Sequence, residues 1–129
     1  MHTAIQEYRK VGVETAFVTA SAYEHVALLF DGVISGLVAS KLAIAQGDIA
    51  GKGEHISRAL NIVDNLRASL DFERGGQLAE RLWSIYEYAE VRMLEANISS
   101  DLEKLDEVIG LFREIQTGWQ AIENDIDKV

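Results

Sequence analysis

Proline is absent from all 129 residues of the chain, and this absence constrains the fold more than any other feature of the sequence. Proline disrupts helices because it lacks an amide donor and clashes with the preceding turn, so long stretches of this chain are free of the strongest helix breaker. Five of the ten glycines lie within residues 47–53 and at residues 75 and 76. The pattern predicts an all-α protein whose helices are joined at these points.

The first helix is predicted from a capping signal. Ser21 is followed three residues later by Glu24, the spacing of a capping box, in which each side chain bonds to the other residue's backbone. We therefore expect a helix that begins at Ala22 and stops near Gly47. The first twenty residues have a poor helical stripe and several β-branched residues, so residues 1–20 are expected to form an N-terminal tail or lid.

Three further helices follow from the breaks. A second is expected from residue 49 or 52 to residue 70, and a third from 77 to 96, after the glycine pair. Asn97 is the candidate for a left-handed C-terminal position, and a second capping pair, at residues 100 and 103, starts a fourth helix at Asp101. Short connections favour antiparallel neighbours, so we predict an antiparallel up-down four-helix bundle spanning residues 21–129 as a single domain.

Apolar residues recur at steps of three and four along each expected helix, as the α-helical period requires. The expected core consists of Val26, Leu29, Phe30, Val33, Leu37 and Ile44; Ile56, Leu60, Val63 and Leu70; Leu78, Leu82, Ile85, Ala89, Met93 and Ala96; and Leu105, Val108, Phe112, Ile115, Trp119, Ile122 and Ile126. The regular alternation in the last set is typical of the seam of a bundle.

Composition excludes several classes of partner. The net charge is −9, with 12 basic and 21 acidic residues, and no cluster of Lys or Arg would neutralise the phosphates of a nucleic acid. There is no cysteine, which fits a reducing compartment. Charged residues such as Glu7 and Lys10 interrupt the N-terminus, and no apolar run is expected to approach the ~20 residues of a membrane span. We expect a soluble cytoplasmic protein that does not insert into membranes.

The sequence offers little basis for catalysis. Di-iron bundles need Glu-x-x-His motifs, whereas here glutamate directly precedes His25 and His55, about 100° apart on a helix. His55 with Arg58 faintly resembles a phosphotransfer site, but an exposed histidine on an amphipathic helix explains it better. The chain has no nucleophile elbow, and GDIAGKG lacks the spacing of a phosphate-binding loop. We predict no enzyme activity, no metal and no cofactor.

Apolar residues remain after the core is assigned. In the third helix Trp83 and Leu94 project away from the core stripe, Tyr86 lies at its edge and Tyr88 lies toward the opposite flank. In the first helix Ile34, Val38 and Leu42 form a second ridge, spaced by four. Such a surplus indicates a wide buried face, a groove for an amphipathic partner helix, or a homodimer interface.

Several segments together resemble the flagellar secretion chaperone FliS family over nearly the whole chain. They are AIQEYRKVGVETA, TASAYEHVALLFDGVISGL, AIAQGDIAGKGEHISRALNIVDNLRASLDFERGGQLAERL, LWSIYEYAEVRMLEAN and LDEVIGLFREIQTGW. The chain departs from the family where Ala22 replaces a proline and Phe30 replaces a tyrosine. Alanine is tolerated at a first helical position, so the helix start is not endangered.

The resemblance implies a function. FliS-like proteins bind the disordered C-terminal segment of flagellin in the cytosol, prevent its premature polymerisation and help present it to the export gate protein FlhA. The expected partner-binding residues are Ile5, Tyr8, Phe30, Ile34, Val38, Leu42, Leu82, Trp83, Tyr86 and Leu94. Ile5 and Tyr8 match a family pair that covers the groove or contacts the export machinery. The alternative is a helical homodimeric scaffold or adaptor unrelated to export.

Overall fold

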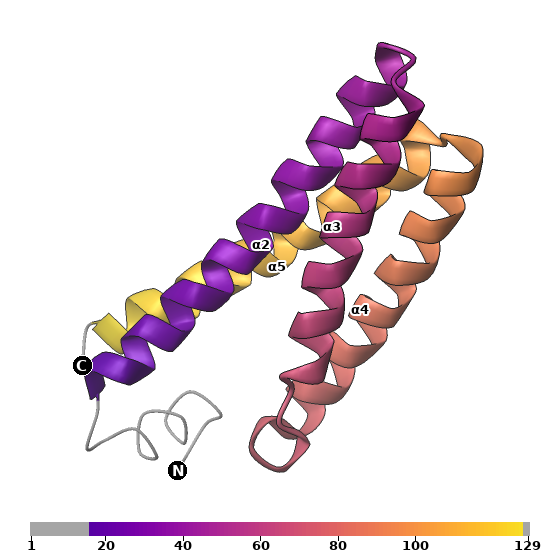
Figure 1. Ribbon diagram of the computed structural model, residues 1–129. Helices are drawn as coiled ribbons and strands as arrows, with labels where there is room; N and C mark the ends of the chain where they lie inside the picture. Colours follow the sequence, from indigo (N-terminus) through magenta and orange to yellow (C-terminus); the bar gives the residue numbers. More distant parts are fainter. Residues whose placement is uncertain (1–15, 128–129) are drawn as a thin grey trace.

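The computed structural model describes the backbone of residues 16–127 and the side chains of residues 22–122. Four helices make up this part of the chain: α2 (Ala16–Ala45), α3 (Ile49–Ala68), α4 (Phe72–Ser99) and α5 (Leu102–Asp127). Each runs antiparallel to the one before it (Figure 1). The prediction of an all-α four-helix bundle is confirmed.

The four helices are arranged in a ring in which each contacts two neighbours, and they splay apart toward one end of the bundle (Figure 1). Each helix packs on the next, and α5 packs on α2. The α2/α5 pair and the α3/α4 pair meet at the end that carries the α2–α3 and α4–α5 connections, and they diverge toward the other end (Figure 1). A cleft lined by residues of all four helices lies at this open end.

The start of α2 differs from the prediction. The helix begins at Ala16, so Ser21 lies inside α2 and does not cap its first turn. A cap contributes only about 1 kcal/mol, and no glycine or proline between residues 16 and 21 stops the helix from continuing past it. The Tyr23 ring stacks on Trp119 of α5 at a centroid distance of 4.6 Å, and the Trp119 indole Nε1 donates a hydrogen bond to the Tyr23 carbonyl at 3.0 Å. The predicted boundary after residue 20 falls within α2, and a separate tail of residues 1–20 stays a prediction.

An aspartate caps the N-terminus of each of the three later helices. The carboxylates of Asp48, Asp71 and Asp101 each accept amide hydrogen bonds from the first turn that follows. Aspartate is favoured at this position because it satisfies amides that lack a partner within the helix. The predicted fourth start is therefore one residue early, since Asp101 is the cap itself. The left-handed residue at the end of α4 is Ser100 (φ 55°) and not Asn97, so that prediction is wrong.

The predicted break at the glycine pair is confirmed only as a kink within α4, which already begins at Phe72 and not at residue 77, since the connection from α3 lies at residues 69–71. Gly76 has φ 49° and ψ −127°, a conformation that glycine reaches because it has no side chain. The turn that opens α4 is thereby separated from the long helical segment that packs into the bundle.

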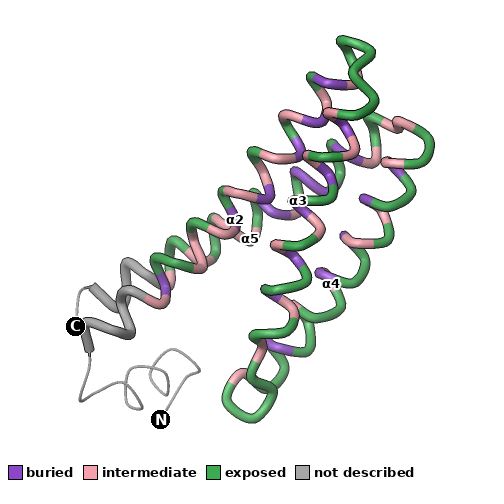
Figure 2. Tube along the Cα trace, viewed as in Figure 1, coloured by how far each residue is buried: buried purple, intermediate pink, exposed green. Residues whose placement is uncertain are grey.

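The core runs along the inner faces of the four helices, and exposed residues face outward (Figure 2). At its centre the ring of Phe112 stacks on Tyr86 at 6.0 Å and lies 6.3 Å from Phe30, so aromatic rings join α2, α4 and α5. The core face of α4 is rotated from the predicted stripe. Tyr86 is buried within it, whereas Leu78, predicted as core, is 44% exposed.

The predicted core is otherwise largely reproduced. Most of the other expected residues are buried or pack against the buried cluster: Val26, Leu29, Phe30, Val33, Leu37, Ile44, Ile56, Leu60, Val63, Leu70, Leu82, Ala89, Met93, Ala96, Leu105, Val108, Phe112, Ile115 and Trp119. The side chain of Ile126 lies outside the described residues.

The hydropathy of one segment of α2 contradicts the expectation that no apolar run approaches the length of a membrane span. Residues Ala22–Ala45 have a mean hydropathy of 1.7 and are long enough to cross a bilayer by length and composition alone. The core helix of a bundle meets the same criterion, and two charged residues of this segment have partners on a neighbouring helix. Lys41 pairs with Asp106, and Asp31 accepts a hydrogen bond from Gln116, both on α5. The high hydropathy therefore reflects a helix that packs on two neighbours and also carries apolar side chains on its outer side.

Candidate partner-binding site

Large apolar side chains are exposed on several faces of the bundle. They include Leu28, Val38, Leu42, Ile49, Phe72, Leu78, Trp83, Tyr88, Val91, Leu94, Ile98 and Leu102. Single exposed apolar residues are common on protein surfaces, but contiguous ones mark sites of interaction. These residues lie on separate faces of the bundle.

The first face lies on α2 beside α5, and we call its residues Ile34, Val38 and Leu42 the α2 ridge. Lys41 lies between Val38 and Leu42 in the sequence and pairs with Asp106 of α5, so this side of α2 faces α5. Ile34 packs against the core, whereas Val38 and Leu42 are 46% and 58% exposed. Steps of four place the three side chains along one side of the helix.

The second face lies on α4 beside α3. Trp83 and Leu94, separated by eleven residues, project in nearly the same direction and are 36% and 51% exposed. The guanidinium of Arg67, on α3, lies 5.8 Å from the centre of the Trp83 ring. Val91 and Ile98 project on the same outer side of the helix, so we call Trp83, Val91, Leu94 and Ile98 the α4 stripe.

The two faces are separate. Helix α2 packs on α3 and α5, and helix α4 packs on the same two helices, so α2 and α4 are diagonal in the ring. The α2 ridge points to the α5 side and the α4 stripe to the α3 side. The residues predicted to bind a partner therefore do not form a single groove.

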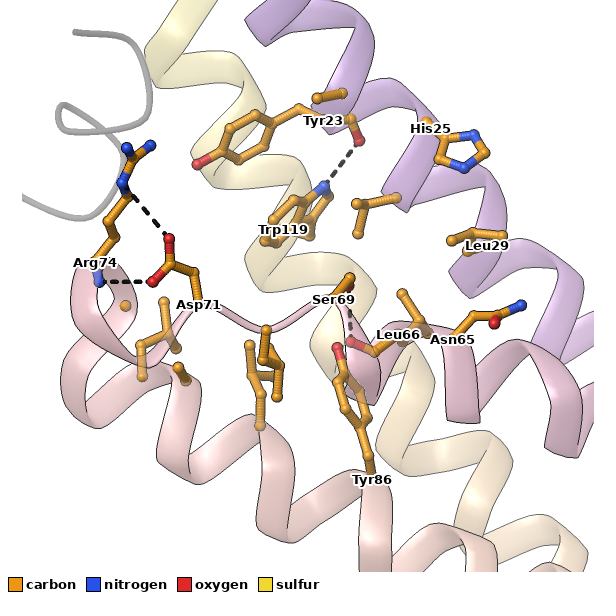
Figure 3. A pocket seen from close by; sticks show the side chains of 17 residues that line it. Tyr23, His25, Leu29, Asn65, Leu66, Ser69, Asp71, Arg74, Tyr86 and Trp119 are labelled. Atoms are coloured by element: carbon orange, nitrogen blue, oxygen red, sulfur yellow. Dashed lines mark hydrogen bonds and ion pairs between the residues drawn. The ribbon is translucent and has the colours of Figure 1, made fainter. Parts of the chain in front are cut away.

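A third apolar surface is the cleft at the open end of the bundle, with a volume of about 810 Å³. All four helices contribute to its walls, and Figure 3 shows the Tyr23 and Trp119 rings on one side and Tyr86 and Leu66 on another. The side chains of Asp71 and Arg74 form an ion pair at its edge, with 3.5 Å between Oδ2 and Nε. Two predicted site residues, Leu82 and Tyr86, line this cleft.

Two predicted contact residues are part of the core. Phe30 is fully buried, with its ring 5.8 Å from Trp119 in an edge-to-face arrangement, and Tyr86 is almost fully buried. Burial raises the pKa of the Tyr86 hydroxyl well above its usual value. Direct partner contact by these two residues stays a prediction. Ile5 and Tyr8 lie outside the described residues.

Tyr88 has a structural role that the sequence pattern did not indicate. Its hydroxyl donates to Glu107 Oε2 on α5 at 2.8 Å, and Arg92 Nε donates to Glu107 Oε1 at 2.6 Å. The Arg92 guanidinium lies 5.7 Å from the centre of the Tyr88 ring. The hydrogen bond from Arg92, followed by that from Tyr88, lowers the pKa of the Glu107 carboxyl. Tyr88 therefore links α4 to α5, although its ring is partly exposed.

Glu90 is the ionisable group with the least satisfied surroundings among the described residues. Its Oε2 lies 3.2 Å from Arg67 Nη1, while its Oε1 is buried and has no hydrogen-bond partner there. Burial raises the pKa of the Glu90 carboxyl, and the Arg67 charge opposes that rise. A carboxylate in this position destabilises the fold relative to its protonated form.

The pH dependence of stability tests this assignment. Because the pKa of Glu90 is raised in the folded state, its contribution to stability is greatest below its ordinary value of 4.5 and is lost as pH rises through the raised pKa. The free energy of unfolding of the wild type relative to Glu90→Gln should therefore fall as the pH rises from below 4.5 toward neutrality. Urea titrations at several pH values measure both free energies of unfolding. A wild type that gains stability relative to Glu90→Gln as the pH rises would contradict the assignment.

The described residues contain no group of three or more His, Asp or Glu side chains that could hold a metal ion. His25 lies at the cleft, and His55 is half-buried on α3. Neither belongs to a cluster that suggests metal or nucleotide chemistry.

These features define a class of protein, a four-helix bundle with apolar side chains exposed on separate faces. The family model described as "Flagellar protein FliS" matches residues 4–126, and the chain belongs to this family. It is similar to proteins named "Flagellar secretion chaperone FliS" from Salmonella typhimurium (43% identical, covering 95% of this chain and 93% of that protein) and Escherichia coli (40%, covering 89% and 85%). A relative from Bacillus subtilis with the same name is 30% identical, covering 83% of this chain and 80% of that protein.

The family is one of chaperones and not of enzymes. The resemblance found in the sequence is thus confirmed.

Proposed function

We propose that this protein is a cytoplasmic flagellar export chaperone that binds the disordered C-terminal segment of flagellin. It keeps flagellin from polymerising early and helps present it to the export gate protein FlhA. The observation that carries the proposal is the exposure of large apolar side chains on separate faces of a FliS-family bundle. We propose that it acts by binding alone, without a cofactor or catalysis.

The separation of the faces favours a long, flexible partner. A rigid globular partner would meet the α2 ridge or the α4 stripe, which lie on different sides of the bundle. A disordered segment can fold in helical pieces along several faces, because burial of apolar surface offsets the entropy lost on ordering. We propose the α2 ridge, Trp83 and Leu94 as contacts, with Leu82 and Tyr86 at the cleft and Phe30 behind it.

The N-terminal segment is proposed as a displaceable lid. Ile5 and Tyr8 supply apolar side chains to residues 1–20, and this segment precedes the part of α2 that lines the cleft. Displacement of such a lid would couple flagellin binding to a change in the exposed surface.

A pull-down tests the function. Immobilised chaperone should retain full-length flagellin and fail to retain flagellin that lacks its C-terminal segment. Deleting residues 1–10 from the chaperone should change the retained amount while leaving the thermal unfolding midpoint unaltered. Equal retention of both flagellins, or of neither, would contradict the proposal.

The second candidate is a homodimeric scaffold. Leu28 and Leu42 are both highly exposed on α2, and such surface can pair with a second copy. Light scattering with and without a flagellin C-terminal peptide distinguishes the two functions. A chaperone binds the peptide, whereas a scaffold is a concentration-dependent dimer that ignores it.

A further inference from the structure

The outer side of α4 combines apolar and acidic side chains. Trp83, Val91, Leu94 and Ile98 form the α4 stripe, and Glu80 and Glu87 project on the same side of the helix. The two arginines of this segment, Arg81 and Arg92, project toward the α5 side instead. Every charge on the stripe side of α4 between residues 80 and 98 is therefore negative.

The Trp83 ring has a charged neighbour on α3. The Arg67 guanidinium lies 5.8 Å from the centre of the Trp83 ring, and it is itself fixed by Asp64 Oδ1 at 3.0 Å and Glu90 Oε2 at 3.2 Å. A planar guanidinium with two carboxylate partners has little freedom left, so it restricts the indole as well. The indole keeps 36% of its surface exposed.

A half-exposed aromatic ring in a fixed orientation is well suited to binding. Tryptophan and arginine are enriched among the few interface residues that dominate affinity, and little conformational entropy is lost when an already ordered side chain is covered. The other members of the α4 stripe continue the apolar surface along the helix beyond Trp83.

We propose that the α4 stripe binds the apolar and basic face of a helical piece of flagellin's C-terminal segment, and that Arg67 is the positioning residue that holds Trp83 as the anchor of this contact. The inference rests on the proposed function and specifies the partner's chemistry at one face. An apolar residue covers Trp83 and Leu94, and lysine or arginine side chains lie beside Glu80 and Glu87.

Charge distinguishes this partner from the other candidates. A second copy of the chain has a net charge of −9 and would bring like charges together at the stripe. An anionic membrane surface would be repelled for the same reason. An amphipathic helix with basic residues beside its apolar face satisfies both parts of the stripe.

Fluorescence tests the anchor directly. The chain has two tryptophans, so a Trp119→Phe variant reports on Trp83 alone. Adding a tryptophan-free flagellin should shift the Trp83 emission to shorter wavelength as the indole leaves water. Trp83→Ala, made in the otherwise natural chain, should weaken flagellin binding by about 30-fold, as removal of a dominant interface aromatic does.

The positioning role is tested by Arg67→Lys. Lysine keeps the charge beside Asp64 and Glu90 but loses the planar group over the indole, so affinity should fall roughly fivefold. The thermal unfolding midpoint should stay close to that of the wild type. Arg81→Lys, on the other side of α4, is the matched control and should bind normally.

The charge complementarity is tested by salt. Wild-type affinity for flagellin should fall as the salt concentration rises, and Glu87→Gln should reduce that dependence. Glu114→Gln removes an exposed carboxylate of α5 and should leave the dependence as it is. Titrations by calorimetry at low and high salt provide the comparison.

The results of these experiments distinguish a failure of the α4-stripe inference from a failure of the proposed chaperone function. If flagellin is retained through its C-terminal segment but Trp83 emission does not change, and Arg67→Lys binds as tightly as the wild type, the inference is wrong and the chaperone function stands. A salt dependence that rises or stays level in Glu87→Gln would overturn the partner's basic character. If the natural chain binds no flagellin, the proposed function itself fails.

Discussion

Phe112→Ala is expected to lower the free energy of unfolding by about 4 kcal/mol, within the usual range for removing a fully buried phenylalanine. Phe112 lies where three helices meet, with its ring stacked on Tyr86 of α4 at 6.0 Å and tilted against Phe30 of α2 at 6.3 Å. Truncation leaves a cavity that two large, rigid rings cannot fill without leaving their own positions. Urea denaturation followed by circular dichroism measures the loss.

The neighbouring residue supplies the control for this prediction. Arg113 is exposed on α5, so Arg113→Ala should change the free energy of unfolding by less than about 0.5 kcal/mol. A loss below about 1.5 kcal/mol in Phe112→Ala would mean that the core collapses around the deletion and that the aromatic contacts are not the centre of the fold.

The double variant Val38→Asp/Leu42→Asp is expected to weaken flagellin binding by more than about 100-fold, equivalent to about 2.7 kcal/mol. Two carboxylates on the α2 ridge would be desolvated beneath an apolar partner helix, and each would lose its hydration without gaining a partner. Both side chains are about half-exposed in the free protein, so the fold should tolerate them. Titration calorimetry with full-length flagellin measures the affinity, and a thermal melt checks the fold.

A control must carry the same added charge. Ala50→Asp/Asn61→Asp places two carboxylates at exposed positions of α3 and brings the molecule to the same net charge. This variant should bind flagellin with nearly unchanged affinity. Equal losses in both double variants would show that overall repulsion, and not the α2 ridge, controls binding.

Much of the fold was predictable because its signals are local. The absence of proline, the glycine pair at residues 75 and 76 and the three-four spacing of apolar residues act within one or two turns of helix. They predicted the four helices, the irregular backbone at Gly76 and most of the buried residues, although the connection between α3 and α4 lies earlier, at residues 69–71. The segments shared with FliS proteins also indicated the family from the sequence alone.

The misplaced helix end shows where local reasoning fails. The capping pair at Ser21 and Glu24 was a valid local signal, yet α2 continues back to Ala16. A cap contributes only about 1 kcal/mol and residues 16–21 contain no helix breaker, so the capping pair does not fix where α2 begins.

The candidate site was predictable only as a set of surplus apolar residues. The sequence indicated that Trp83, Leu94 and the α2 ridge exceed what the core needs, but it could not place them relative to one another. The ring order of the helices puts them on different faces. It also buries Phe30 and Tyr86, which were expected as partner contacts, Phe30 having been predicted as a core residue as well.

Helix number, helix breaks and family membership thus follow from the order of residues along the chain, because short-range spacing decides whether a segment is helical and which side is apolar. The separation of the two apolar faces, the cleft at the open end and the Arg67 guanidinium over Trp83 follow only from tertiary packing. Each brings together residues from different helices, and their proximity depends on how the helices cross and diverge. No periodicity within a single helix encodes that geometry.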